Sequence, residues 1–418
     1  MRVKKLLTKV LGLCSEMVII DAALNDSGAR PGLSVWVRAK VRRQGRCGRC
    51  GGQAAWYDRG DGQRSWRHVD AGYATCTLVA LAPRVNCKIC GVIVAAVPWA
   101  RHDTAFTRAF EDLICWDAVR ASKATAARRH GISWRAVNGI CVRVATEMLG
   151  RVDLLEGLVA IAIDEVKYKK GQRYLTVVCD HFTGRVIWAA EGRSKATVTK
   201  FFETLGPERA TGLRFVTADG AEWIHQIVNE HAPGATICLD TFHLVGWATK
   251  ALDELRREEW NRLRATGGAK AAKTVKGLRW ILLRNWANLT SAQRDVIRDL
   301  ETTNRRLTRG YQLKEELRAI LQMPIIAARH ALDEWLAWAS RSRLAPFIKL
   351  ARTIRRFRTE IEATIEWRLT NGLAESNNAA IGRIRSNARG FHDPKAFITM
   401  IMLDRAGLTP KLPWAAAA

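Results

Sequence analysis

Three acidic residues, Asp164, Asp219 and Glu375, have types suited to divalent-metal chemistry. Converging carboxylates can hold two divalent ions, which activate a nucleophile and neutralise a leaving oxyanion in phosphodiester cleavage and transfer. Hard oxygen ligands favour Mg²⁺ or Mn²⁺ over zinc. Asp164 would bridge both ions, Asp219 would hold one and Glu375 the other. Because an acidic residue is more often a solvated surface charge, each assignment depends on the element that carries it.

The elements around the first two acids follow the order of an RNase H-like core. An apolar run over 157–163, rich in Val and Ile, predicts a buried strand that ends at Asp164. A right-handed crossover can place a later strand, ending at Asp219, beside the first. The two carboxylates would then be neighbours in space. The further predicted elements are strands over 172–180, 185–190, 213–218 and 235–239 and helices over 195–205 and 221–230.

The third acid follows a long helical segment. Residues 245–365 are rich in Trp and Arg and carry no strand pattern. Asn371-Gly372 is a turn signal, and Glu375 then falls on the opening of a predicted helix. Three arginines close behind it are candidate DNA contacts: Arg383, Arg385 and Arg389.

Two C-x2-C pairs form a candidate zinc site: Cys47 with Cys50, and Cys87 with Cys90. Each pair is followed by glycine, as in the tight knuckle that turns backbone N–H groups toward sulfur. Alternating stretches between the pairs, over 65–69 and 75–81, predict strands, so that two knuckles on a small antiparallel sheet would make a zinc ribbon. Coincidental thiol pairs or a redox motif are the alternatives. The six other cysteines are scattered singly and are predicted to be small core residues.

The segment 121–137 has the outline of a helix-turn-helix. A glycine turn at Gly131 separates two predicted helices, and Ser133 stands where an N-cap belongs. Trp134, Val137, Ile140 and Val144 are predicted to form the inner face of the second helix, which could enter a major groove. Small helical hairpins without DNA-binding function are also common. The candidate DNA contacts here are Arg128, Arg129, Ser133, Trp134 and Arg135.

The net charge points to a polyanionic partner. The chain of 418 residues has 67 Lys and Arg against 40 Asp and Glu, a net charge of +27, with a pI near 10.3. Double-stranded DNA is the first candidate. An anionic membrane has no support, because no long apolar run or sustained basic amphipathic helix is present. Lys9 and Glu16 interrupt any signal peptide, so a cytoplasmic, nucleoid-associated location is expected.

Several of these stretches together resemble a DDE transposase of the ISL-three insertion-sequence family, in its actinobacterial form. The resemblance runs from Cys47 to about Leu408. It implies that Asp164, Asp219 and Glu375 are the catalytic triad and that the helical block is an insertion before the glutamate. The stretches that carry the resemblance are 97–101 (VPWAR), 163–165 (IDE), 173–178 (RYLTVV), 218–221 (ADGA), 240–243 (DTFH), 247–254 (WATKALDE), 371–376 (NGLAES) and 390–392 (GFH).

Asp240 and His243 match the family's acid-x-x-His element. They could position a flanking phosphate or a hairpin strand, and a structural histidine is the alternative. Two departures could weaken DNA contacts: Ala379-Ala380 stands where Thr-Lys is frequent, and Gly246 stands where a basic residue is frequent.

The sequence therefore predicts an α/β protein whose RNase H-like core is interrupted by an all-helical insertion and preceded by a zinc ribbon and a helix-turn-helix. The leading hypothesis is a transposase that binds terminal inverted repeats and catalyses metal-dependent cleavage and strand transfer into target DNA. Pairing two ends makes a homodimer the expected state on DNA. The alternatives are a transposase-derived regulator without catalysis and a stand-alone nuclease. Glu165 and residues 1–40 receive no role.

The expected domains are 1–100 (lead-in and ribbon), 101–152 (helix-turn-helix), 153–244 (core, first part), 245–365 (insertion), 366–410 (last core helix) and 411–418 (tail).

Overall fold

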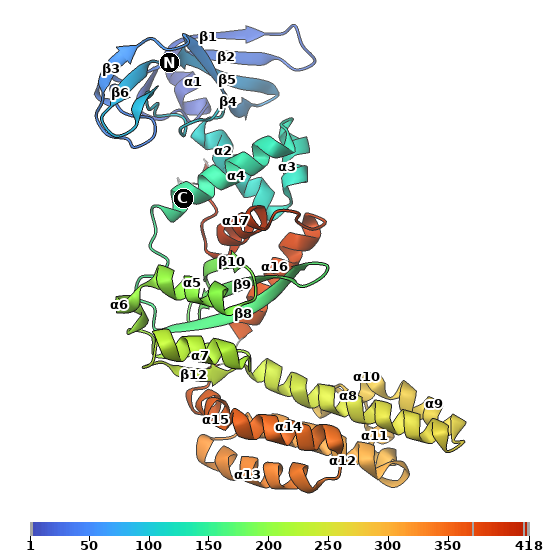
Figure 1. Cartoon of the computed structure of the whole chain (residues 1–418). Helices are drawn as coiled ribbons and strands as arrows, with labels where there is room; N and C mark the ends of the chain where they lie inside the picture. The colour runs from blue at the N-terminus through green and yellow to red at the C-terminus, as the bar shows by residue number, and fades with distance from the viewer. Residues whose placement is uncertain (1–2, 370–371, 413, 416–418) are drawn as a thin grey trace. The chain divides into compact units, whose positions relative to one another are not determined.

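The computed structural model describes residues 3–369, 372–412 and 414–415. The chain forms two compact units, Met1–Leu154 with Ile381–Ala418, and Leu155–Ala380 (Figure 1). The domain boundaries expected from the sequence stay a prediction. Asn371 of the expected turn lies outside the described residues, as do Pro413 and residues 416–418 of the tail. No helix in the described part of the chain is long and apolar enough to cross a lipid bilayer.

A five-stranded sheet forms the centre of the unit Leu155–Ala380. The first three strands in the chain pair antiparallel, and the last two run parallel to the first. The predicted meander, crossover and parallel return are thus confirmed. The spatial order is β10 (Val186–Glu191), β9 (Arg173–Asp180), β8 (Ala160–Lys169), β11 (Phe215–Ala218) and β12 (Thr236–Leu239).

Strand β8 differs from its prediction in where it ends. It continues for five residues beyond Asp164, to Lys169, so Asp164 stands in mid-strand. The residues after Asp164 still pair with β9, as far as Lys169 opposite Arg173. Tyr168 is buried, and its hydroxyl donates to Glu191 of β10 at 2.7 Å, which stabilises this half of the strand. The apolar run alone therefore marks only the fully buried half.

Helices connect and follow the strands of this unit. The predicted crossover helix is confirmed as α5 (Lys195–Leu205), followed by α6 (Pro207–Ala210) and, after β11, by α7 (Glu222–His231). Residues 245–365 are helical without any strand, as predicted, and pack around their own apolar core, which includes Leu252, Leu313 and Trp335. These helices are α8 (Thr241–Ala265), α9 (Ala269–Gly277), α10 (Arg279–Leu282), α11 (Ser291–Thr303), α12 (Arg305–Ile320), α13 (Ile325–Arg341), α14 (Ala345–Arg356) and α15 (Arg358–Trp367).

The N-terminal part of the other unit contains two separate sheets, where the sequence predicted one. The knuckles border a three-stranded sheet of β3 (Ala55–Asp58), β6 (Arg84–Cys87) and β7 (Gly91–Val94). The strands predicted between the cysteine pairs exist as β4 (Gln63–Ala71) and β5 (Ala74–Leu81). They belong instead to a four-stranded sheet with β1 (Met17–Asn25) and β2 (Gly32–Ala39). Helix α1 (Val3–Val10) precedes this sheet in the sequence. Buried Val35, Trp66 and Leu78 give this second sheet its own core.

The helix-turn-helix is formed by α3 (Lys123–His130) and α4 (Trp134–Leu149), preceded by α2 (Arg108–Arg120). Gly131 ends α3 at φ +63°, a left-handed conformation that favours glycine, and the Ser133 hydroxyl accepts from the N–H of Ala136. Val137, Ile140 and Val144 are buried as predicted, but Trp134 is half exposed, so its predicted place on the inner face is wrong. A first-turn residue of a helix can point past the core that its later residues face.

Two C-terminal elements complete this unit. α16 (Gly372–Asn387) enters it at Ile381, and α17 (Pro394–Arg405) packs against α4 and α2. Phe391, in the connection between the two helices, stacks on Phe397 of α17 with ring centroids 4.5 Å apart.

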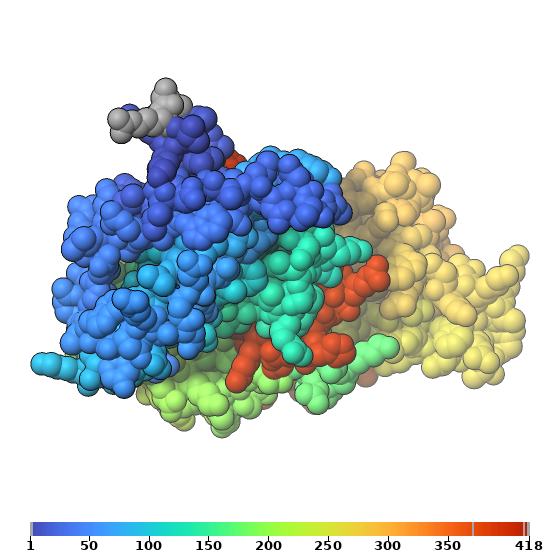
Figure 2. Space-filling model, turned by 90° about the horizontal axis from the view of Figure 1, so that it is seen from above, coloured from blue at the N-terminus to red at the C-terminus, as the bar shows by residue number. Residues whose placement is uncertain are grey.

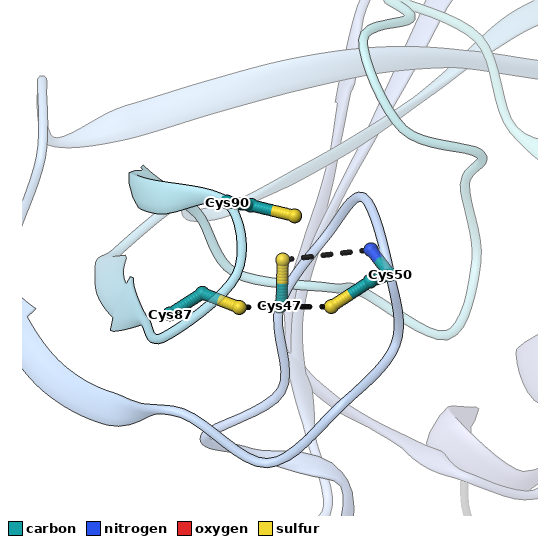
Figure 3. A group of neighbouring side chains, drawn as sticks. All are labelled: Cys47, Cys50, Cys87 and Cys90. Carbon is teal, nitrogen blue, oxygen red and sulfur yellow. Dashed lines mark hydrogen bonds between the residues drawn. The ribbon is translucent and has the colours of Figure 1, made fainter.

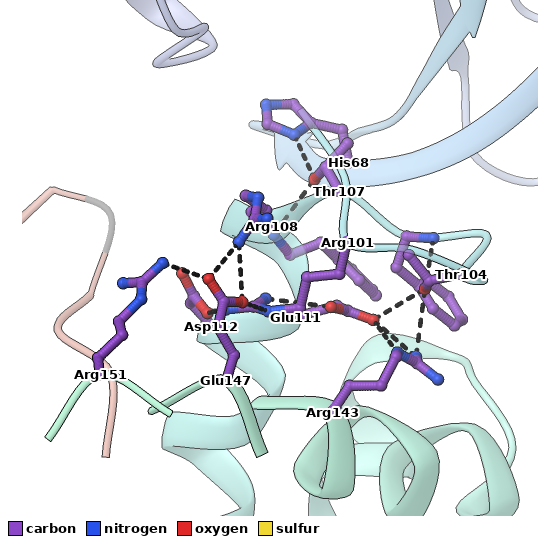
Figure 4. Close-up of polar contacts among 12 residues, drawn as sticks. His68, Arg101, Thr104, Thr107, Arg108, Glu111, Asp112, Arg143, Glu147 and Arg151 are labelled. Atoms are coloured by element: carbon purple, nitrogen blue, oxygen red, sulfur yellow. Dashed lines mark hydrogen bonds and ion pairs between the residues drawn. The ribbon is translucent and has the colours of Figure 1, made fainter. Parts of the chain in front are cut away.

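A buried ion-pair network connects the segment after β7 with α2 and α4 (Figure 4). Arg101 donates to Glu111 at 3.0 Å and Asp112 at 2.7 Å and also contacts Glu147. The Glu111 side chain is fully buried and is also paired with Arg143 at 2.6 Å. Because buried charges require partners, this network explains structurally why an arginine follows the Val97–Ala100 stretch.

Candidate metal centres and nucleic-acid interface

The four predicted zinc ligands come together. One thiol sulfur from each of Cys47, Cys50, Cys87 and Cys90 lies within 4.8 Å of the others (Figure 3). Gly51 and Gly91 adopt φ of +72° and +73°, so each knuckle turns at its glycine as predicted. The N–H of Gly51 donates to the carbonyl of Cys47 at 3.0 Å, which closes the first knuckle.

The electrostatics of these thiols fit a bound cation. Burial opposes ionisation of Cys47, but backbone N–H groups of Cys50 and Arg49 lower its pKa to about 7. Burial and the facing thiols raise the pKa of Cys90 to about 12, because several negative sulfurs in one place repel one another. A Zn²⁺ ion bound by four thiolates relieves that repulsion, and a tetrahedral four-sulfur set is its usual structural site. The donor set therefore fits zinc.

Asp164 within β8 and Asp219 directly after β11 occupy equivalent levels along two adjacent parallel strands. Ala162 of β8 pairs with Thr217 of β11, and each acid lies two residues further along its strand direction. The structure thus brings the two sequence-predicted acids to neighbouring strands at the same level. Asp219 follows β11 directly, and its carboxylate accepts from the N–H of Ala221 at 3.0 Å, which fixes its orientation.

The Asp164 carboxylate is held by two donors. The Glu165 N–H donates to one oxygen at 2.7 Å, and the side-chain amide of Asn378 donates to the other. Burial raises the pKa of Asp164, and these two donors partly offset that effect. A buried carboxylate that is already oriented is well suited to bind a cation.

Glu165, to which the sequence gave no role, belongs to the same cluster. Arg193, which follows β10, ion-pairs with one Glu165 oxygen at 2.5 Å and approaches Asp219 at 3.9 Å. The other Glu165 oxygen is buried and has no hydrogen-bond partner among the described residues. Burial and the Asp219 charge raise the pKa of Glu165 to about 7, while Arg193 acts in the opposite direction. Such crowding of carboxylates is what a divalent cation relieves, so the donor set fits Mg²⁺ or Mn²⁺.

Glu375 lies in the first turn of α16 and is exposed. Asn378, which bonds Asp164, lies three residues later and therefore on the same helix face. The amide of Asn377 is buried and donates to the Gly184 carbonyl at 2.8 Å, which attaches this turn to the β9–β10 connection. The helix opening that carries Glu375 is thus held against the sheet that carries Asp164.

Asp240 and His243 also face this cluster. Asp240 is 4% exposed, caps α8 by accepting from the N–H of Phe242 at 2.9 Å, and holds Nδ1 of His243 at 2.9 Å. The hydrogen bond with Asp240 raises the pKa of His243, and the charges of Asp219 and Asp164 act in the same direction. A histidine with a raised pKa offers a cation beside the acids.

The acids do not converge as tightly as the thiols. Among the described residues, the four cysteines are the one group of three or more metal-ligand side chains within 4.8 Å of one another. Sequence reasoning missed Glu165, Arg193, Asn377 and Asn378. Glu165 directly follows Asp164, and the two asparagines closely follow Glu375, so their positions beside the candidate acids could have indicated a role. No feature of the sequence around Arg193 indicates its role.

The predicted DNA contacts all fall in the unit that contains the helix-turn-helix. Arg128, Arg135, Arg383 and Arg389 are exposed, and Arg385 is half-buried. Arg129 is exposed but ion-pairs with Asp117 at 3.3 Å. Ser133 acts as a helix cap. A cavity of about 430 Å³ is lined by Trp134 and Arg389 together with buried Lys123.

Comparison with protein families matches three consecutive parts of the chain. A transposase family, DDE_Tnp_ISL3, matches residues 161–401. The helix-turn-helix domain of transposase family ISL3, the ISL-three family of the sequence resemblance, matches residues 95–145. The zinc finger of transposases IS204/IS1001/IS1096/IS1165 matches residues 43–90.

Curated relatives agree with these matches. The transposase for insertion sequence element IS1557 of Mycobacterium tuberculosis, in strains CDC 1551 and H37Rv, is 42% identical over 434 residues, covering 99% of this chain and 98% of the relative. The transposase for insertion sequence element IS1001 of Bordetella parapertussis is 32% identical over 244 residues, covering 58% of this chain and 59% of the relative.

Proposed function

The chain belongs to the ISL3 family of transposases, and on that premise we propose that it binds the terminal inverted repeats of an insertion sequence, hydrolyses a phosphodiester bond at each end and joins the 3′-hydroxyl ends to target DNA. The observation that carries this proposal is the register of β8 and β11, which supports a carboxylate pair, Asp164 and Asp219, on neighbouring parallel strands. The hydrogen bond from Asn378 to Asp164 supports Glu375 as the third acid. No observation favours a regulator without catalysis.

In the proposed mechanism, Asp164, Asp219 and Glu375 would hold Mg²⁺ or Mn²⁺. When bound, two such ions activate the attacking oxygen and neutralise the leaving one. Asn378 and the Glu165 backbone orient the Asp164 carboxylate. Arg193 holds Glu165 and lies close to Asp219, so it limits repulsion within the acid cluster. His243, whose pKa is raised by its hydrogen bond with Asp240, contacts a phosphate that flanks the cleaved bond.

DNA recognition is assigned to the other unit. Zn²⁺ bound by Cys47, Cys50, Cys87 and Cys90 stabilises the ribbon, and α4 enters the major groove with Trp134 and Arg135 toward the bases. Arg128, Arg129, Arg383, Arg385 and Arg389 contact phosphates. Two chains pair the two ends as a homodimer, and the protein acts on nucleoid DNA in the cytoplasm.

The test replaces Asp164 with asparagine, which keeps the size of the side chain but removes its charge. Loss of a partner around a metal ligand costs about 10–100-fold in activity, so we expect loss of the ligand itself to exceed that. Binding to the terminal repeats should persist. The loss of activity is measured as cleavage of a labelled terminal-repeat duplex with Mg²⁺ or Mn²⁺. Binding to the terminal repeats is measured by a gel-shift assay.

Asp180→Asn is the matched control, because Asp180 ends the neighbouring strand β9 and caps a turn that asparagine also caps. It should cleave as the wild type does. Undiminished cleavage by Asp164→Asn would contradict the assigned role. A wild type that binds the repeats but never cuts with either metal would contradict the proposed reaction.

A further inference from the structure

The first three helices of the insertion enclose a groove that the proposed mechanism does not use. α9 packs along α8, and α10 contacts both (Figure 1); their surface is yellow in Figure 2. The groove has a volume of about 560 Å³. Of its eight lining residues, five are Arg or Lys and two are Trp, and none is acidic. Every charge that lines it is therefore positive.

The positive charge of the groove is only partly neutralised. Asp253 is the acid beside it, and that one carboxylate ion-pairs with Arg256 at 2.8 Å, Arg257 at 3.0 Å and Arg279 at 3.7 Å. Lys273 and Lys276 are exposed and form no ion pair among the described residues. One carboxylate against five cations leaves a net positive groove, which attracts phosphates.

Two tryptophans give the groove a second property. Trp280 is 69% exposed, although an indole gains most from burial. The Arg279 guanidinium lies 4.9 Å from the Trp280 ring centroid, and Lys276 lies 5.9 Å from that of Trp260. An exposed aromatic ring with cations beside it is the arrangement that binds an unstacked base together with its phosphate. In a paired duplex the base faces are covered by stacking, so duplex DNA would leave Trp280 unused.

We propose that this groove binds a single-stranded segment of DNA, with a base stacked on Trp280 and the adjoining phosphates on Lys273 and Lys276. The proposal deepens the proposed function and rests on it, because a transposase exposes unpaired strands when it cuts and joins DNA. An acidic polypeptide would satisfy the cations but gives no reason for the exposed indole.

The experiment measures binding of the full-length protein to two fluorescein-labelled probes by anisotropy: an oligothymidine of about 12 nucleotides, within the usual range of single-strand sites, and a duplex of the same length without repeat sequence. Trp280→Ala should weaken oligothymidine binding about tenfold, in keeping with the loss of one stacking contact. It should leave duplex binding unchanged. Trp280→Phe, which keeps an aromatic face, should retain most of the affinity.

The electrostatic part is tested with Lys273→Gln and Lys276→Gln. Each should lower the slope of log affinity against log salt by about 0.7, as for one lost single-strand phosphate contact. Lys270→Gln is the matched control, because Lys270 is exposed on the same helix but does not line the groove. A probe with 5-iododeoxyuridine should photocrosslink to Trp280 or Trp260, and mass spectrometry of the cross-linked peptide identifies the site.

The outcomes separate this proposal from the proposed function. Asp164→Asn should abolish end cleavage and keep both oligothymidine binding and the crosslink. Oligothymidine binding that is unaffected by Trp280→Ala, or an equal loss for single-stranded and duplex probes, would overturn the groove proposal alone. Trp280-dependent binding of a polyglutamate peptide without any of oligothymidine would assign the groove to an acidic polypeptide and overturn it as well.

Discussion

Asn378 joins the strand of Asp164 to the helix of Glu375 by a hydrogen bond between residues 214 positions apart. Its amide donates to one Asp164 oxygen and so determines which way the carboxylate faces. Asn377, next to it, instead attaches the helix to the Gly184 carbonyl and is 1% exposed. Two adjacent asparagines therefore have different tasks, one for orientation and one for stability.

Asn378→Ala should reduce the rate of end cleavage by about 10–100-fold, the usual effect of losing a partner that orients a metal ligand. Repeat binding should not change, and half-maximal cleavage should require more Mn²⁺, because Asp164 is no longer pre-oriented. Cleavage rates over a Mn²⁺ titration measure both effects. A purely structural role for Asn378 would leave the Mn²⁺ requirement unchanged and would contradict the expectation.

Asn377→Ala and Ala379→Ser provide the comparison. Asn377→Ala leaves a buried carbonyl without its donor, which costs about 1–3 kcal/mol, so hydrogen exchange at the start of α16 should accelerate. Ala379 is exposed next to Asn378, so Ala379→Ser should alter neither exchange nor cleavage.

At the scale of elements, Arg101 connects the ribbon side of its unit with α2 and α4. Its guanidinium contacts three carboxylates and its side chain is 9% exposed. Arg101→Ala should destabilise this unit by about 3–5 kcal/mol, because it leaves Asp112 without its ion pair and takes one cationic partner from both Glu111 and Glu147. Hydrogen exchange of α2 and α4 under increasing urea measures this locally. Arg151→Ala removes an exposed partner of the same Glu147 and should cost no more than about 1 kcal/mol; equal effects of the two variants would contradict a structural role for the network.

Glu147 makes the same network depend on pH. Burial alone would raise its pKa, but Arg101 and Arg108 outweigh burial and lower it. A carboxyl group whose pKa is lower in the folded than in the unfolded state stabilises the fold at any pH above its unfolded-state pKa, which is about 4.3 for glutamate. That stabilisation is lost as the pH falls through the folded-state pKa. The stability difference between wild type and Glu147→Gln should therefore be largest near neutral pH and shrink below about pH 4. Hydrogen exchange of α2 and α4 under increasing urea, repeated at several pH values, measures the stability difference between the two proteins. A difference that grows toward acidic pH would contradict the expectation.

The elements that the sequence predicted well are those whose pattern is local. The strands and helices of the five-stranded sheet, the glycine knuckles and the Ser133 cap each follow from a few consecutive residues. What the sequence missed depends on distant partners. β2 pairs in parallel with β5 across 43 positions, as Gly32 does with Thr75, and no local pattern specifies that choice. The side chains of Arg193 and Asn378 likewise acquire their roles only when the sheet and α16 are assembled.

At the scale of the whole molecule, the chain leaves the DNA-binding unit at Leu154 and re-enters it at Ile381, within α16. One continuous helix therefore carries Glu375 in its first turn and the candidate DNA contacts Arg383 and Arg385 in its second half. Substitutions at Arg383 or Arg385 should then weaken DNA binding, whereas a substitution at Glu375 in the same helix should impair cleavage.

Removal of zinc should unfold one of the two sheets of the N-terminal region and leave the other folded. β3, β6 and β7 border the thiols, whereas β4 and β5 have a core of their own with Val35 and Trp66. Metal binding supplies the folding energy of such knuckles, about 10–16 kcal/mol in zinc-finger peptides. A chelator should therefore abolish hydrogen-exchange protection in β3, β6 and β7 and weaken repeat binding, while β4 and β5, and β8, β9 and β11 of the other unit, stay protected.

Cys47→Ser should reproduce the effect of the chelator. Cys14→Ser should not, because Cys14 is exposed in the same unit and away from the four-cysteine group. Elemental analysis should find about one zinc per chain in the wild type and none in Cys47→Ser, as four thiolates are needed to complete one tetrahedral site. Purified protein that lacks zinc and still protects β6 and β7 would show that the knuckles fold without metal and would contradict the ribbon assignment. Repeat binding that survives the loss of the ribbon would instead restrict recognition to the helix-turn-helix, since its α4 does not depend on the thiols for its cap or its buried face.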